Sequence, residues 1–238
     1  MLTPQDRTIV ALDCSQERAI QLVDMLGENL NWVKVGMELF YATGSAFVKE
    51  LKSRGLNVFL DLKLHDIPNT VEQASRVLAG FGADMITVHG LGSPKMIEAA
   101  RRGLDEGARL AGLKPPVLLA VTILTSMDQN ALESIGVFES VQDEACRLAK
   151  AAFGAGADGV VCSAFEAHMM RDLLGKEAYI VTPGIRPQGS ATQDQSRVAT
   201  PLFAIREGAS HLVIGRPVTQ AQDPLFALKK VQEELETL

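Results

Sequence analysis

Eight short, uniformly apolar runs recur along this 238-residue chain, and their spacing limits the possible folds more than any other feature. Most of the runs are too short and too continuously apolar to form amphipathic helices, so we predict strands that are buried on both faces. The predicted strands are Thr8–Asp13, Trp32–Gly36, Asn57–Lys63, Asp84–His89, Val117–Thr122, Asp158–Cys162, Tyr179–Thr182 and His211–Gly215. Hydrophobic residues make up 47% of the chain but aromatic residues only 5%, so aliphatic side chains must build the core.

Helical patterns lie between and after the predicted strands. They cover Gln16–Leu26, Gly44–Arg54, Thr70–Gly80, Pro94–Leu110, Ser140–Gly154, Phe165–Leu174, Pro201–Glu207 and Pro224–Leu238. Alternation of strand and helix implies a parallel sheet, and eight such units in about 250 residues match a closed (β/α)8 TIM barrel of the α/β class. An open, doubly wound sheet is the structural alternative. Because no linker or change of composition marks a second domain, residues 1–238 are predicted to form a single (β/α)8-barrel catalytic domain.

Charge and targeting patterns narrow the class of protein. A formal net charge of −6 disfavours a general nucleic-acid surface, which is normally basic. The N-terminus shows no secretory signal, and no apolar run reaches the roughly 18–20 residues needed to span a bilayer. Three widely spaced cysteines, Cys14, Cys146 and Cys162, suit a reducing compartment better than a disulfide framework. We therefore expect a cytoplasmic protein without nucleic-acid or membrane partners.

Polar residues gather at the C-terminal ends of the predicted strands, where barrels of this type carry their active sites. They are Asp13, Lys34, Asp61, Lys63, His89, Thr122, Thr125, Arg186 and Arg216. Burying charges without partners is costly, so the convergence of these side chains predicts a functional site.

The segment Asp61–Thr70 places two acids around a lysine, directly after an apolar run. Because side chains alternate along a strand, Asp61 and Lys63 are expected to project to the same side and to hold each other ionised. Such a cluster at a strand end suits proton chemistry better than packing.

Arginines follow the last two predicted strands. Gly215-Arg216 lies where (β/α)8 barrels commonly bind phosphate, because glycine allows close backbone approach and arginine offers a planar fork of donors. Arg186 is a candidate for a second fork. The polar stretch Pro187–Gln195 is a candidate mobile lid, from which Gln195 would hydrogen-bond the substrate. The lack of a GxxxxGKS/T sequence argues against an NTP-binding phosphate loop.

Several of these segments resemble the motifs of bacterial orotidine 5′-phosphate decarboxylases. The matching segments span almost the whole chain in order and are Val10–Asp13, Val33–Gly36, Asp61–Thr70, Val121–Ser126, Val181–Arg186 and Val213–Arg216. The pattern Asp-x-Lys-x-x-Asp is shared with related sugar-phosphate barrels. The Ile-Pro-Asn-Thr that follows it, together with the other segments, makes the resemblance specific.

The resemblance implies decarboxylation of orotidine 5′-monophosphate to uridine 5′-monophosphate and carbon dioxide, the last step of de novo pyrimidine synthesis. Similar enzymes use no metal and no organic cofactor, and they are homodimers with active sites at the subunit interface. The catalytic residues implied for this chain are Lys63, Asp61, Asp66 and Lys34. The implied substrate-binding residues are Asp13, Lys34, Asp61, Ile67, Thr70, Thr125, Arg186, Gln195, Gly215 and Arg216.

Within that set the resemblance distributes roles over the substrate. Asp13 and Lys34 would bind the ribose hydroxyls, and Thr125 would contact the pyrimidine. The phosphate would be held by Arg186, Gln195, Gly215 and Arg216. Asp66, Ile67 and Thr70 would reach into the site of the partner subunit.

The chemistry of the implied reaction needs a cation beside the reacting carbon. Loss of the C6 carboxylate leaves electron density in the plane of the ring, where the ring cannot easily delocalise it. A fixed ammonium beside C6 stabilises that charge and then supplies the proton, which is the role implied for Lys63. Asp61 and Asp66 would favour the charged form of this lysine.

Two other functions remain open from the sequence. A magnesium-dependent sugar-phosphate decarboxylase or aldolase on a similar barrel would use the acids to hold metal, but Lys34 stands where those relatives usually place a glutamate and would repel a cation. His65 and His89 lack a tight metal-ligand spacing, so packing or supporting roles are expected for both. A non-catalytic nucleotide-binding barrel would need the arginines but has no evident use for the acid–lysine–acid array.

Overall fold

The computed structural model describes residues 2–187 and 199–236, and within these ranges eight parallel strands close into one barrel. The strands neighbour one another in chain order, and β1 pairs with β8 to close the ring. They are β1 (Thr8–Ala11), β2 (Trp32–Gly36), β3 (Asn57–Leu64), β4 (Met85–His89), β5 (Val117–Val121), β6 (Gly159–Val161), β7 (Tyr179–Thr182) and β8 (His211–Ile214). The predicted closed barrel is therefore confirmed, and the open-sheet alternative is wrong.

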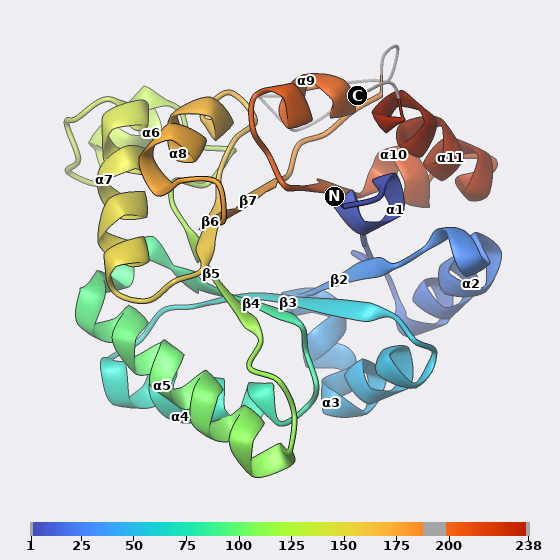
Figure 1. Ribbon diagram of the computed structural model, residues 1–238, viewed down its shortest axis with the longest axis horizontal. Coiled ribbons are helices and arrows are strands. Elements are labelled where there is room, and N and C mark those ends of the chain that lie inside the picture. The colour runs from blue at the N-terminus through green and yellow to red at the C-terminus, as the bar shows by residue number, and fades with distance from the viewer. Residues whose placement is uncertain (1, 188–198, 237–238) are drawn as a thin grey trace.

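Helices surround the strands at the periphery of the molecule (Figure 1). They are α1 (Pro4–Arg7), α2 (Gln16–Leu26), α3 (Met37–Ser53), α4 (Pro68–Ala79), α5 (Ser93–Ala111), α6 (Gln129–Ser134), α7 (Val141–Gly154), α8 (Ala167–Leu174), α9 (Pro201–Arg206), α10 (Arg216–Thr219) and α11 (Pro224–Leu235). Two 3-10 turns, η1 (Gly27–Asn29) and η2 (Gly90–Gly92), lie among the described residues. Helices α4 and α5 lie side by side (Figure 1). Gly103 and Gly107 of α5 allow this close approach, because a Cβ atom at either position would lie 2.1 Å from a carbonyl oxygen of α4.

The structure departs from the predicted helices in a few places. Helices α1, α6 and α10, of four to six residues, were not predicted, because such short runs show little periodicity; α9, which also has six residues, was predicted. Helix α3 begins at Met37, and its predicted start, Gly44, is a kink with a positive φ of 65°. The last helix, α11, ends at Leu235 within the described residues. Its predicted end, Leu238, lies outside them.

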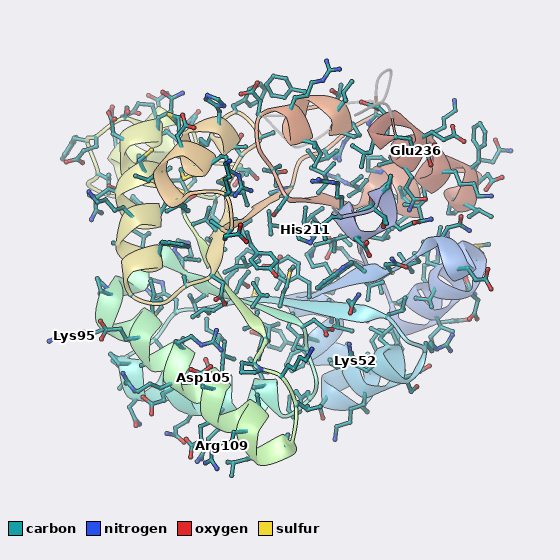
Figure 2. All side chains as sticks on the ribbon, in the orientation of Figure 1. Lys52, Lys95, Asp105, Arg109, His211 and Glu236 are labelled. Atoms are coloured by element: carbon teal, nitrogen blue, oxygen red, sulfur yellow. The ribbon has the colours of Figure 1, made fainter. Side chains whose placement is uncertain are left out.

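The strands are buried on both faces, as predicted. Their outward side chains pack against the helices, and their inward side chains form a separate cluster inside the barrel. The inner cluster consists of Ile9, Ala11, Phe59, Met85, Leu119, Val181 and Val213. His211 lies among the strands near the centre of the view, whereas Lys95 and Arg109 on α5 project outward (Figure 2). None of the helices in the described ranges is long and apolar enough to cross a bilayer.

Candidate active site

A cavity of about 430 Å³ lies at the carboxyl ends of the barrel strands, which is within the usual size range for a small-molecule site. Its floor is formed by inward-facing apolar residues of the strands, namely Ala11, Phe59, Val121, Val161 and Val213. The polar residues that line it include the sequence-predicted Asp13, Lys34, Asp61, Lys63, Thr125, Arg186, Gly215 and Arg216. The cavity therefore brings together most of the predicted site residues from separate strands.

Alternating charges form a row along one wall of the cavity. Nζ of Lys34, on β2, lies 2.8 Å from Oδ1 of Asp13 and 3.6 Å from Oδ2 of Asp61. Nζ of Lys63 lies 2.8 Å from the other carboxylate oxygen of Asp61. The side chains of Lys34 and Asp61 are only 10% and 13% exposed, so their mutual attraction offsets part of the cost of removing both charges from water.

The carboxylate of Asp61 is the centre of this row. Burial alone would raise the pKa of Asp61, but the ammonium charges of Lys34 and Lys63 and hydrogen bonds from Lys63 and Thr87 outweigh burial and hold that pKa below its ordinary value. Asp61 is therefore a fixed negative charge at neutral pH.

Glycine at the end of β2 leaves space for one of these ion pairs. A Cβ atom at Gly36 would lie 3.0 Å from Oδ1 of Asp13 and 3.2 Å from Nζ of Lys34. Both distances are tighter than ordinary van der Waals contact, so a larger residue would press on the pair. Sequence reasoning placed Gly36 in a motif but did not predict this role.

Lys63 reaches Asp61 through an irregular strand end and not through simple alternation. Lys63 has a φ of +50°, in the left-handed region that residues with a side chain rarely adopt. The register between β3 and β4 also shifts here. Leu60 pairs with Ile86 and Leu64 pairs with Val88, so four residues of β3 span the same length as two of β4. The expected proximity of Asp61 and Lys63 is met, but regular strand geometry is the wrong reason for it.

Thr87, on β4, is part of this arrangement although the sequence did not single it out. Its hydroxyl oxygen accepts a hydrogen bond from the Lys63 backbone N–H at 2.9 Å and lies 3.1 Å from Oδ1 of Asp61, to which it donates. Thr87 is fully buried, as one polar residue in an apolar run. Its inward register, two residues after the inward-facing Met85, was the available signal.

The chain after β7 and β8 carries the predicted anion-binding groups, which line the same cavity. Gly215 precedes the short helix α10, which begins with Arg216, and Arg186 follows β7 in a largely buried position. Pro183 and Gly184, which lie in the recognised Val181–Arg186 segment, also line the cavity, as do Thr219 and Gln220, which were not predicted. Gln195 and most of the predicted lid lie outside the described residues.

The predicted residues Asp66, Ile67 and Thr70, in the segment that directly follows β3, do not line this cavity. His65 to Thr70 are all exposed, and the side chain of Ile67 is 66% exposed. Oδ1 of Asp66 accepts a hydrogen bond from the backbone N–H of Ile67 at 2.7 Å. Within its own chain, this segment points to a surface and not to the Asp61–Lys63 pair.

The histidines and cysteines give no sign of a metal centre. The rings of His65 and His89 stack with centroids 5.4 Å apart. Burial, together with the charges of His65 and Lys63, lowers the pKa of His89 below its ordinary value. The three cysteines are free thiols. Across residues 2–187 and 199–236, no group of three or more His, Cys, Asp or Glu side chains is placed to hold a metal ion.

The chain is similar to known proteins over nearly its whole length. Residues 6–231 match the family described as orotidine 5′-phosphate decarboxylase / HUMPS. The chain is 48% identical over 237 residues to an orotidine 5′-phosphate decarboxylase of Methylobacterium sp. (strain 4-46), covering 98% of this chain and 97% of that protein. It is 47% identical over 234 residues to the Moorella thermoacetica protein of the same name, covering 98% and 93%.

A solved structure gives the same answer for the fold. The crystal structure of orotidine 5′-phosphate decarboxylase from Lactobacillus acidophilus superposes with a TM-score of 0.85 and 41% sequence identity. The match covers 95% of this chain and 97% of that one.

Proposed function

The chain belongs to the orotidine 5′-phosphate decarboxylase / HUMPS family, and on that premise we propose that it converts orotidine 5′-monophosphate to uridine 5′-monophosphate and carbon dioxide. The relatives named above are enzymes of the carboxy-lyase class, and this reaction belongs to pyrimidine synthesis. The observation that carries the proposal is the Asp61–Lys63 pair, which lines the same cavity as Arg186 and Arg216.

Lys63 is the proton donor in this mechanism. The bond between C6 and the carboxylate carbon breaks, carbon dioxide leaves, and the electron pair remains on C6. The ammonium of Lys63 stabilises that pair and transfers a proton to C6, and the resulting amine recovers a proton from solvent. Asp61, 2.8 Å from Nζ of Lys63, keeps the ammonium charged and aimed before substrate binds.

The remaining cavity residues bind the rest of the substrate. Asp13 and Lys34 bind the ribose hydroxyls, and Thr125 contacts the pyrimidine. Arg186 and Arg216 hold the phosphate together with the backbone at Gly215. The family resemblance assigns Gln195, which lies outside the described residues, to the same phosphate. The support for this division is that the acid–lysine row comes from the ends of β1 to β3, whereas the arginines follow β7 and β8, and both groups line one cavity. Binding energy at the distant phosphate then organises the reacting end, and so appears in the rate.

The reaction needs no metal in this account. The carboxylates of Asp13 and Asp61 already face ammonium groups, and Nζ of Lys34 lies within 3.6 Å of both. A divalent cation placed between these acids would be repelled by the Lys34 ammonium. A magnesium-dependent decarboxylase or aldolase would need that position for a ligand, so the charge row favours the metal-free mechanism.

Two copies of the chain share their active sites in this proposal. Asp66, Ile67 and Thr70 are exposed in the single chain. A partner subunit that covers this segment would remove the apolar side chain of Ile67 from water. In a homodimer, these residues would complete the site of the partner subunit, and Asp66 would become a second acid beside that subunit's lysine.

The setting of the enzyme follows from the same premise. We place it in the cytoplasm, where three free thiols are chemically stable and pyrimidine precursors are made. The whole chain acts as one catalytic domain, without nucleic-acid or membrane partners.

A direct assay tests the proposal. Purified protein is incubated with orotidine 5′-monophosphate, and uridine 5′-monophosphate and carbon dioxide are quantified together. Equimolar release of both products is expected. A nucleotide-binding module without catalysis would bind uridine 5′-monophosphate and release neither product, and that result would contradict the proposal.

A further inference from the structure

The hydroxyl of Thr87 joins the backbone of one reacting residue to the side chain of the other. It accepts from the Lys63 N–H at 2.9 Å and donates to Oδ1 of Asp61 at 3.1 Å. The same oxygen of Asp61 faces Nζ of Lys63 at 2.8 Å. Thr87 does not line the cavity, so it acts on this pair from behind.

The bond to Lys63 compensates for a break in the sheet. Between the pairs Leu60–Ile86 and Leu64–Val88, β3 advances four residues while β4 advances two. Lys63 lies in this bulge with a φ of +50°, which costs a residue with a side chain conformational energy. The Thr87 side chain provides an acceptor for the Lys63 N–H where the β3–β4 ladder is interrupted.

The direction of the two hydrogen bonds is fixed by their chemistry. A backbone N–H can only donate, so the Thr87 oxygen is its acceptor and the hydroxyl proton is left for Asp61. An ionised carboxylate can only accept, which suits that proton. One hydroxyl therefore holds the Asp61 carboxylate in the orientation that faces Nζ of Lys63, while it also anchors the backbone that carries Lys63.

We propose that Thr87 is a positioning residue for decarboxylation, which fixes Asp61 and Lys63 relative to each other before the substrate binds. This inference rests on the proposed function of the site. An ordinary buried threonine would affect folding stability when replaced but would leave the rate of the chemical step unchanged. A positioning residue instead affects kcat much more than product binding, because small displacements of a proton donor are costly.

Four variants separate these two roles. Thr87→Ser keeps the hydroxyl and Thr87→Ala removes it, while both lose the methyl group; Thr87→Val keeps the shape and removes the hydroxyl. Thr8→Val is the matched control, since Thr8 is also a buried strand threonine and its hydroxyl bonds to the carbonyl oxygen of Pro4 at 2.8 Å, away from the cavity. The readouts are kcat, KM and the Kd for uridine 5′-monophosphate.

We expect Thr87→Val and Thr87→Ala to lower kcat by about 10- to 100-fold. Thr87→Ser and Thr8→Val should keep kcat within about threefold of the wild type, and the product Kd should stay within about threefold throughout. Wild-type kcat in Thr87→Ala, or equal damage in the serine and alanine variants, would overturn the proposal. If Thr87→Val does not fold, the serine–alanine pair decides the question.

Amide hydrogen exchange at Lys63 adds a readout that needs no activity. The Lys63 N–H should exchange at least about tenfold faster in Thr87→Ala than in Thr87→Ser. A wild-type protein that releases no uridine 5′-monophosphate overturns the proposed function, whereas equal exchange rates in the two variants overturn the positioning role.

Discussion

Nζ of Lys63 lies 2.8 Å from Oδ1 of Asp61, although Lys63 itself has a left-handed backbone conformation that interrupts β3. A strained backbone and a partly buried ion pair at the same point need compensation from the surrounding structure. Here the ammonium of Lys34 and the hydroxyl of Thr87 provide it. Backbone strain that is held in place by its surroundings is typical of functional sites, and here it places a charged lysine at one fixed point of the cavity.

Replacing Lys63 should separate catalysis from binding. In Lys63→Ala the proton donor and the cation beside C6 are both lost, so kcat should fall on the order of 10⁴-fold or more. The Kd for uridine 5′-monophosphate should change much less, because the phosphate-binding arginines remain. Lys52→Ala is the control, since Lys52 makes an ion pair with Asp84 at 2.6 Å outside the cavity. Retained turnover in Lys63→Ala would exclude Lys63 as the donor.

Arg216 should matter for the rate and little for stability. In Arg216→Ala a charge-assisted contact to the phosphate is lost, and kcat/KM should fall by about 10- to 100-fold. The free energy of unfolding should change by about 0.5 kcal/mol or less, as for other substitutions outside the core. Arg206→Ala, at an exposed position away from the cavity, should leave both quantities unchanged. An unaltered kcat/KM in Arg216→Ala would remove this residue from the site.

Mixing two inactive variants tests whether active sites are shared. If Asp66 serves the partner subunit, a heterodimer of Lys63→Ala with Asp66→Ala contains one site in which both residues are intact. Random exchange of subunits should then restore about a quarter of wild-type activity, because half of the dimers are mixed and each has one intact site. No recovery after subunit exchange, confirmed by a mass tag on one variant, would contradict the shared site.

Acid should destabilise the protein partly through His211, which lies at the opposite end of the barrel from the cavity. Burial, with the nearby charge of Arg7, lowers the pKa of His211 from 6.5 to about 4, and Asp6 opposes this only weakly. Between these values the unfolded chain binds a proton that the folded chain does not bind. Stability from this group is therefore present above about pH 6.5 and is lost as the pH falls toward 4.

The size of this effect can be measured with a matched pair of variants. Between pH 7 and pH 5 the wild type should lose about 2 kcal/mol of unfolding free energy through His211. His211→Gln should remove that part of the pH dependence, whereas His168→Gln should keep it because His168 is exposed. Urea unfolding at equal protein concentrations measures the difference. An identical pH dependence in His211→Gln and the wild type would rule out this role.

Local patterns predicted the barrel because its strands are buried on both faces and therefore appear as apolar runs. The short helices α6 and α10 were missed since fewer than two turns give no clear period. The kink at Gly44 was interpreted as a helix start, because a glycine in the sequence can mark either the boundary of a helix or a break within one.

Much of the candidate site was predictable for a similar reason. The carboxyl ends of parallel strands meet on one face, so Asp13, Lys34 and Asp61 could be grouped without a structure. For Thr87 the sequence could indicate only an inward position on β4, because its hydrogen bonds to Lys63 and Asp61 depend on a register shift between β3 and β4 that only the three-dimensional pairing reveals. Gly36 was in a recognised motif, but its closeness to the Asp13–Lys34 pair is likewise a tertiary feature.

The decisive measurement for a metal-free site follows the loss of orotidine 5′-monophosphate absorbance with purified protein in excess chelator. We expect full turnover under these conditions, the same as without chelator, and almost none with Lys63→Ala. Activity that disappears in chelator and returns with added magnesium would contradict a metal-free site centred on Lys63 and Asp61.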